Sequence, residues 1–195
     1  MEVQKIESGP CDNNTYLIMG EKEACLIDAS CSVSEIEKHL QGKKLCGVVL
    51  THGHYDHFAN LDDIVNKFDI KCYLSKECYD KIKNSATNCS HIFGLDYISN
   101  LPKKSFIFIE NEEKIDISQE ISAIFYRTPG HTDCGVCVKF DDDKLFTGDT
   151  LFNGTIGRTD LPTSSSEQMR KSLKYLFDNF KNCHIYPGHG SDTVI

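Results

Sequence analysis

Four residues that can bind a metal ion lie together in the segment 51–57, whose sequence is THGHYDH. His52 and His54 are two residues apart, so in an extended chain their imidazoles point to the same face and can bind one cation. Asp56 and His57 follow as the chain turns into the next segment. Imidazole and carboxylate groups are ligands that zinc, iron and manganese accept. The spacing therefore predicts a transition-metal site.

Three further ligand-type residues lie next to a glycine, each directly after a strand-like run. They are His131, Asp149 and His189. Glycine allows the backbone to turn sharply and approach a cation closely, and a loop at a strand end holds a reactive group near solvent. Each residue alone has an ordinary structural explanation, as a turn residue or a helix cap. Because five of the eight histidines fall in these glycine-containing segments, we interpret all seven residues as one metal centre.

Seven ligands exceed the roughly four that one tetrahedral zinc ion uses, so we expect two divalent ions. Asp149 is the natural bridge between them, because a carboxylate offers two oxygens whereas an imidazole offers one nitrogen at a time. Two cations about 3.5–4 Å apart lower the pKa of a water between them toward ~7 and yield a bridging hydroxide. The predicted chemistry is hydrolysis of a polarised carbonyl. Asp56 is the catalytic candidate, as a group that could also orient this water or accept its proton. Zinc is the first expectation, with iron or manganese as alternatives.

Arg158 lies in the segment 154–162, shortly after Asp149. One interpretation is an ordinary turn stiffened by Pro162, with Asp160 as a local cap. The other is that the guanidinium donates hydrogen bonds to a substrate carboxylate. The residues themselves leave both interpretations open.

Short strands and a few helices must position these residues. A β-branched run at 46–50 is predicted as the strand that precedes His52. Further strands are predicted over residues 3–7, 15–19, 24–28, 71–74, 106–109, 114–117, 121–128, 135–140, 144–147 and 184–186, with 141–143 as a hairpin turn. Helices are predicted from Ser32 or Ser34 to about residue 40, and over residues 58–68, 76–83 and 166–180. The polar segment 84–100 is predicted as a loop that could lie near the site.

Strands dominate both halves of the chain and no boundary separates them, so residues 1–195 are predicted to form a single domain. The economical architecture is α+β, with two packed sheets and helices outside them. The length allows a substantial core. A charged fraction of 26% and the lack of low-complexity tracts are typical of a folded globule.

The composition also argues against several classes of partner. A net charge of -8 opposes attraction to phosphate backbones and anionic lipid. The N-terminal residues lack a basic region followed by an apolar run, and no apolar stretch is long enough to span a bilayer. We therefore expect a cytoplasmic protein that acts on a small molecule, with no nucleic acid or membrane partner. The ten cysteines are expected to be mostly reduced thiols.

The motifs as a set resemble those of the metallo-β-lactamase superfamily, and more narrowly its short, single-domain glyoxalase II-like hydrolases. The matching segments are His52-Gly53-His54-Tyr55-Asp56-His57, Pro129-Gly130-His131-Thr132, Gly148-Asp149-Thr150-Leu151-Phe152, Gly157-Arg158-Thr159-Asp160 and Pro187-Gly188-His189-Gly190. The resemblance implies a four-layer αββα sandwich with the site at one edge of the sheets. It also implies that His52, His54 and His131 bind one metal, that Asp56, His57 and His189 bind the other, and that Asp149 binds both.

This resemblance implies a hydrolase that cleaves thioesters such as S-lactoylglutathione. Glyoxalase II-like enzymes carry a basic residue at the position of Arg158, where it contacts the carboxylate of the thiol carrier. Flavodiiron proteins usually carry Glu at the position of His54, and β-lactamases carry Cys at that of Asp149, so the motifs argue against both. Relatives often have Pro-Gly where this sequence has Asp133-Cys134, which places a thiol near the centre.

Three alternatives stay open at this point. A persulfide dioxygenase shares the ligand set but uses a single iron. A lactone hydrolase of the same superfamily uses the same site on another substrate. The third is a metal-binding module without catalysis.

Overall fold

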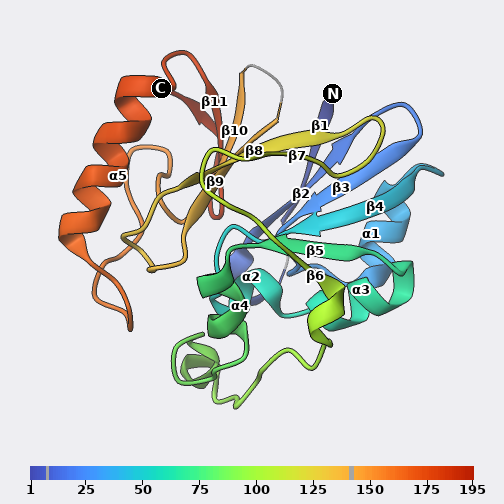
Figure 1. Cartoon of the computed structure of the whole chain (residues 1–195), viewed down its shortest axis with the longest axis horizontal. Coiled ribbons are helices and arrows are strands. Elements are labelled where there is room, and N and C mark those ends of the chain that lie inside the picture. Colours follow the sequence, from blue (N-terminus) through green and yellow to red (C-terminus); the bar gives the residue numbers. More distant parts are fainter. Residues whose placement is uncertain (8, 141–142) are drawn as a thin grey trace.

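Two mixed β-sheets pack face to face with helices on their outer sides (Figure 1). The computed structural model of the chain describes residues 1–7, 9–140 and 143–195. Over these residues each sheet has six strands, in the orders β1-β2-β3-β4-β5-β6 and β12-β11-β10-β9-β8-β7. The α+β fold with four αββα layers that the sequence predicts is therefore confirmed.

The first sheet is formed by β1 (Glu2–Glu7), β2 (Asn14–Met19), β3 (Glu23–Ile27), β4 (Lys44–Val49), β5 (Lys71–Leu74) and β6 (Phe106–Phe108). Its helices are α1 (Val33–His39), α2 (Tyr55–Phe58), α3 (Leu61–Phe68) and α4 (Lys76–Ile82). The meander β1-β2-β3 is antiparallel, whereas β3, β4, β5 and β6 pair in parallel. Parallel pairing brings the carboxyl ends of these strands to one edge of the sheet, where the segment 51–57 begins.

The second sheet is formed by β7 (Lys114–Asp116), β8 (Ser122–Arg127), β9 (Val136–Phe140), β10 (Lys144–Gly148), β11 (His184–Pro187) and β12 (Thr193–Val194), and it is covered by α5 (Ser166–Asn179). Short 3₁₀ helices occur at Pro10–Asp12, Ser90–Phe93 and Lys103–Ser105. The pair β10–β11 is parallel, so the segments that follow these two strands leave the same edge. β9 and β10 pair antiparallel, and the turn predicted between them includes residues 141–142, which lie outside the described residues.

Three apolar layers hold the sandwich together. The central layer lies between the sheets and includes Ile27 and Val49 from the first sheet and Phe125 and Phe146 from the second. The outer layers pack α1, α3 and α4 on the first sheet and α5 on the second. Burying side chains of this size stabilises the fold by about 1.5–3 kcal/mol each. The layers therefore form a rigid frame for the loops at the strand ends.

The helix predicted over residues 58–68 is wrong at its start, because two helices stand there instead. α2 ends at Phe58 and α3 begins at Leu61. The His57 carbonyl accepts a hydrogen bond from the Ala29 N–H (2.7 Å), and the Asn60 N–H donates to the Ala29 carbonyl (2.9 Å). The His57 carbonyl and the Asn60 N–H therefore bond to the segment after β3 and do not take part in one continuous helix. The break leaves Asp56 and His57 on a separate single turn beside β3.

The polar segment 84–100 packs against α2 through aromatic rings. Tyr55 lies 5.4 Å from Phe93 and 5.2 Å from Tyr97, measured between ring centroids, and its N–H donates to the Asn88 carbonyl. The predicted loop thus lies next to the helix that carries Asp56 and His57. None of the helices over the described residues is both long and apolar enough to cross a membrane.

Candidate metal centre

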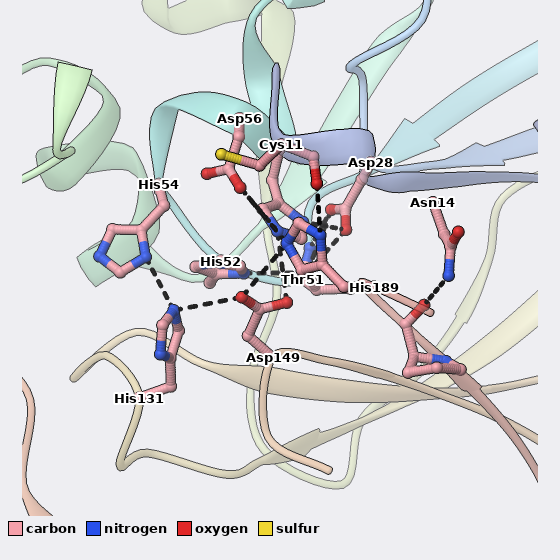
Figure 2. Close-up of polar contacts among 12 residues, drawn as sticks. Cys11, Asn14, Asp28, Thr51, His52, His54, Asp56, His131, Asp149 and His189 are labelled. Carbon is pink, nitrogen blue, oxygen red and sulfur yellow. Dashed lines mark hydrogen bonds and ion pairs between the residues drawn. The ribbon is translucent and has the colours of Figure 1, made fainter. Parts of the chain in front are cut away.

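All seven predicted ligands come together at the edge where the strand ends of both sheets meet (Figure 2). The segment after β4 supplies His52, His54, Asp56 and His57, and the β8–β9 loop supplies His131. Asp149 directly follows β10, and His189 lies two residues after the end of β11. His52 and His54 lie beyond the end of β4 at Val49, but the chain there is still extended at His54, and their ring centroids lie 4.9 Å apart.

The first group of ligands consists of His52, His54 and His131, all of them buried. Their ligand atoms all lie within 4.8 Å of one another. His54 Nδ1 and His131 Nε2 are 2.9 Å apart. Three imidazoles from two loops thus surround one point, which is a common donor set for zinc or iron.

The second group consists of Asp56, His57 and His189, whose ligand atoms also lie within 4.8 Å of one another. His189 Nε2 is 3.4 Å from Asp56 Oδ2, and His57 Nε2 is 3.7 Å from the same oxygen. This group contains a carboxylate and is more accessible than the first, because Asp56 and His189 are only partly buried.

Asp149 lies between the two groups. Its Oδ1 is 3.3 Å from His57 Nε2, and its Oδ2 is 3.4 Å from His131 Nε2. His189 Nε2 is 3.6 Å from Oδ2. One carboxylate therefore contacts histidines of both groups, which is the arrangement that a bridging ligand requires.

The charge distribution favours metal ligation at this point. Burial, followed by repulsion from the neighbouring histidines, holds the pKa of His52 well below its ordinary value. Burial likewise lowers the pKa of His54 to about 3. Both imidazoles are therefore neutral near pH 7, with the free lone pair that a metal ligand needs.

His57 and Asp149 behave in the opposite way, as a charged pair. Burial opposes the charge on His57, but the carboxylates of Asp149, Asp28 and Asp56 outweigh it and raise its pKa well above the usual range. Burial also opposes the charge on Asp149, yet His57 lowers the pKa of this carboxyl. The carboxylates around His57 therefore favour positive charge at this point.

Buried polar atoms without hydrogen-bond partners test whether these residues fit metal ions. Among the described residues, the Nε2 atoms of His52, His54 and His57 and Oδ1 of Asp149 are buried and have no hydrogen-bond partner. Such an atom costs about 1–3 kcal/mol when it stays unpaired. All four belong to the ligand set. His52, His57 and Asp149 offer ligand atoms that lie within 4.8 Å of one another, so cations that accept these lone pairs fit the site.

Three of the histidines have an oxygen acceptor next to their Nδ1 atom. His57 Nδ1 lies 2.7 Å from Asp28 Oδ2, His131 Nδ1 lies 2.8 Å from the Arg158 carbonyl, and His189 Nδ1 lies 3.2 Å from the Cys11 carbonyl. An acceptor at Nδ1 keeps the proton there and leaves Nε2 free to bind a cation.

Asp28 lies beside the predicted ligands, although the sequence does not single it out. It is 1% exposed and accepts hydrogen bonds from the Thr51 N–H (2.8 Å) and the Thr51 hydroxyl (2.9 Å to Oδ2), besides its contact with His57. An acidic residue at the end of an apolar strand run was the available signal. Its carboxylate orients His57, one of the predicted ligands.

Gly188 allows the β11 end to approach the centre closely. A Cβ at this position would overlap Asp149 Oδ1 and would lie 2.7 Å from His57 Cε1. A larger residue would therefore displace ligands of both groups. The glycine beside His189 serves this close packing.

Arg158 contacts the ligand cluster through its main chain, whereas its guanidinium pairs with Asp160. Its side chain is exposed and forms a two-bond pair with Asp160, with Nε 2.6 Å from Oδ1 and Nη2 2.7 Å from Oδ2. Its carbonyl, rather than its guanidinium, contacts a ligand, because it accepts from His131. Asp160 is therefore the partner of Arg158.

The comparisons with known proteins agree with this geometry. The model of the metallo-beta-lactamase superfamily matches residues 8–189. A probable metallo-hydrolase of Streptococcus pyogenes serotype M6 is 33% identical over 203 residues, covering 100% of this chain and 86% of that protein.

Two crystal structures at 26% identity share the fold. The B3 metallo-beta-lactamase BLEG-1 gives a TM-score of 0.91 and covers 99% of this chain and 94% of its own. TTHA1623 in a di-iron-bound form gives a TM-score of 0.84 and covers 98% and 94%. The chain belongs to the metallo-beta-lactamase superfamily.

Proposed function

We propose that this metal-dependent hydrolase cleaves thioesters of glutathione or of another small thiol, with two divalent ions held by the seven ligands. The observation that carries the proposal is the position of Asp149, which contacts histidines of both ligand groups while its Oδ1 lacks a hydrogen-bond partner. Zinc suits this nitrogen and oxygen donor set, and iron or manganese are the alternatives. The di-iron form of TTHA1623 keeps iron among the candidates.

Each part of the site has a role in this reaction. When bound, two divalent cations would supply an activated water with a pKa of about 7 and would polarise the carbonyl oxygen. His52, His54 and His131 would hold one ion, Asp56, His57 and His189 the other, and Asp149 both. The Asp56 side chain is 15% exposed, so it can be reached by solvent and can orient a water or accept its proton. Asp28 keeps His57 in the tautomer that directs Nε2 inward.

The exposed guanidinium of Arg158 favours a substrate that carries a carboxylate, as glutathione does. The guanidinium presents two parallel donors, which Asp160 occupies in the structure. A substrate carboxylate can displace Asp160 and form the same two hydrogen bonds, because the side chains of Arg158 and Asp160 are both exposed. The thiol carrier would then lie over the 157–160 segment and its thioester would face the centre.

Substitution of Arg158 by Met should raise KM for S-lactoylglutathione about 10-fold and change kcat little, because the lost charged hydrogen bonds bind ground state and transition state alike. Asp160→Asn should lower KM, since it frees the guanidinium. Steady-state kinetics on both variants test this, with Arg170→Met on α5 as the matched control. An unchanged KM in Arg158→Met would remove this residue from substrate binding.

Metal removal should abolish turnover and lower the melting temperature. Ions that bind only the folded state stabilise it by about 4 kcal/mol at 1,000 times their dissociation constant, and the carboxylates of the centre lose their neutralising charge without them. Dialysis against a chelator, followed by calorimetry and by addition of Zn²⁺, measures both effects. Full activity at less than about one tenth of an ion per chain would contradict a metal mechanism.

A substrate panel decides between the candidate activities. We expect S-lactoylglutathione to be cleaved by protein that binds two ions per chain. The likeness to a B3 metallo-beta-lactamase adds a β-lactam to the panel, beside a lactone and a phosphoester. Oxygen uptake with glutathione persulfide, one iron per chain and no thioester cleavage would instead identify a dioxygenase. No turnover on any substrate would favour a metal-binding module without catalysis.

A further inference from the structure

Lys81 is a buried cation outside the ligand set. Its side chain is 3% exposed, although it belongs to α4 on the outer side of the first sheet. Its ammonium lies 3.0 Å from Asp133 Oδ1 and donates a hydrogen bond to the Thr163 hydroxyl at 2.6 Å. A buried ammonium costs several kcal/mol unless it is paired, so these contacts require a specific local arrangement.

The stem of Lys81 lies against the first ligand loop. A Cβ built on Gly53 would lie 2.9 Å from Lys81 Cβ and 3.1 Å from its Cγ and Cδ. Gly53 stands between His52 and His54, so the lysine stem packs on the peptide that joins two ligands of the first group. Any other residue at position 53 would push the stem or the loop aside.

The ammonium of Lys81 connects the two segments that hold the third ligand of this group. Asp133 follows His131 by two residues. Thr163 belongs to the segment whose neighbouring residue Ser164 donates from its hydroxyl to the His131 carbonyl (2.7 Å). The same segment begins near Arg158, whose carbonyl lies 2.8 Å from His131 Nδ1. The main chain and the ring of His131 are thus both held by the segment 158–164, which Lys81 contacts at Thr163.

The backbone conformation of Thr163 indicates that its contact with Lys81 is specific. Its φ is 67°, a left-handed conformation that is unfavourable for a β-branched residue. In this conformation its hydroxyl lies within hydrogen-bond distance of both Lys81 Nζ and Asp133 Oδ1, at 2.6 and 3.1 Å. Residues in such conformations persist only where their surroundings hold them. The Lys81 and Asp133 contacts provide this restraint.

We propose that Lys81 is a positioning residue that fixes His52, His54 and His131 relative to one another and thereby sets metal affinity at the first group alone. The second group has its own supports, because Asp28 holds His57 and the Cys11 carbonyl holds His189. The inference rests on the metal centre proposed above. It adds a residue that affects metal affinity at one of the two positions and not at the other.

Co²⁺ titration of metal-free protein, followed by its visible absorption, tests this in two single-site backgrounds. His189→Ala weakens the second group and reports on the first, whereas His131→Ala reports on the second. Lys81→Met keeps the stem over Gly53 and removes the ammonium. We expect it to weaken Co²⁺ binding about 10–100-fold in the His189→Ala background and less than about threefold in the His131→Ala background. Lys83→Met is the matched control, because Lys83 donates to the Ser99 and Leu101 carbonyls instead.

Asp133→Asn is a second variant that keeps the inference testable if Lys81→Met does not fold. Asp133 is 48% exposed, so the neutral amide should preserve the fold, and we expect the same selective loss. Equal affinities with and without the substitution in both backgrounds would overturn the role of Lys81. So would a uniform loss that follows the lower stability of the metal-free protein in urea. Absence of Co²⁺ binding with Lys81 intact would refute the metal centre itself, which separates the two failures.

Discussion

Asp149→Asn should reduce the metal content from two ions per chain to one and lower kcat/KM for the thioester about 10³-fold. Asn has the size of Asp but carries no charge, and its amide nitrogen cannot bind a cation. The Oδ1 and Oδ2 atoms of Asp149 contact His57 and His131 respectively, so replacing one of these oxygens by an amide nitrogen removes a ligand from one of the two metal positions. The substitution would also remove the carboxylate that lies 3.3 Å from His57 Nε2, whereas Asp28, 2.7 Å from Nδ1, stays in place.

Elemental analysis and steady-state kinetics on the same preparation measure this effect. Asp178→Asn is the matched control, since Asp178 pairs with Lys174 on the exposed side of α5. Asp178→Asn should keep both ions and full activity. If Asp149→Asn kept two ions and stayed within about threefold of the original rate, the bridging role of this carboxylate would be wrong.

Asp28→Asn should lower kcat/KM and metal affinity at the second group about 10–100-fold, because the neutral side chain no longer orients His57. It should also reduce the free energy of unfolding of the metal-free protein by about 3 kcal/mol, since it breaks a fully buried pair with His57. The pair is fully enclosed, as the His57 side chain is 0% exposed and that of Asp28 is 2% exposed. Denaturant unfolding and Co²⁺ titration measure the two effects separately.

Asn is the informative substitution at position 28 because the backbone there is left-handed, with φ 59°. Asn adopts this conformation readily, so the change removes the charge without adding strain. Asp69 has a φ of 50° at the end of α3 and is exposed, which makes Asp69→Asn the matched control. A variant at position 28 with unchanged Co²⁺ affinity in the His131→Ala background would show that His57 needs no carboxylate partner.

The sequence predicted most strands and the ligand-bearing loops because both depend on local patterns. The bounds predicted for β2, β5 and β8 from alternating or β-branched runs nearly equal the observed ones. The break between α2 and α3 was not predictable in this way. It depends on hydrogen bonds between His57, Asn60 and the Ala29 main chain, which belong to another part of the sequence.

Residues around the ligands were harder to predict than the ligands themselves. The type and spacing of His52 and His54 identify them as candidate ligands. In the sequence Asp28 is an ordinary residue at a strand end, and Lys81 is an ordinary helix lysine. What distinguishes Asp28 is its contact with His57. What distinguishes Lys81 is its burial between Gly53 and Asp133. Both features arise only when distant segments pack together.

The sequence by itself determined which donor atoms are present, that they follow strands, and hence that imidazole and carboxylate chemistry is concentrated in a few loops. Only the tertiary structure decided that Asp149 contacts both histidine groups, that Arg158 pairs with Asp160, that Asp28 contacts His57, and that Lys81 is buried against Gly53. The physical reason is that side-chain type and spacing act within a few residues along the chain. The distances between loops are set by two sheets packing through a shared apolar layer, which brings residues 28, 57, 149 and 189 together.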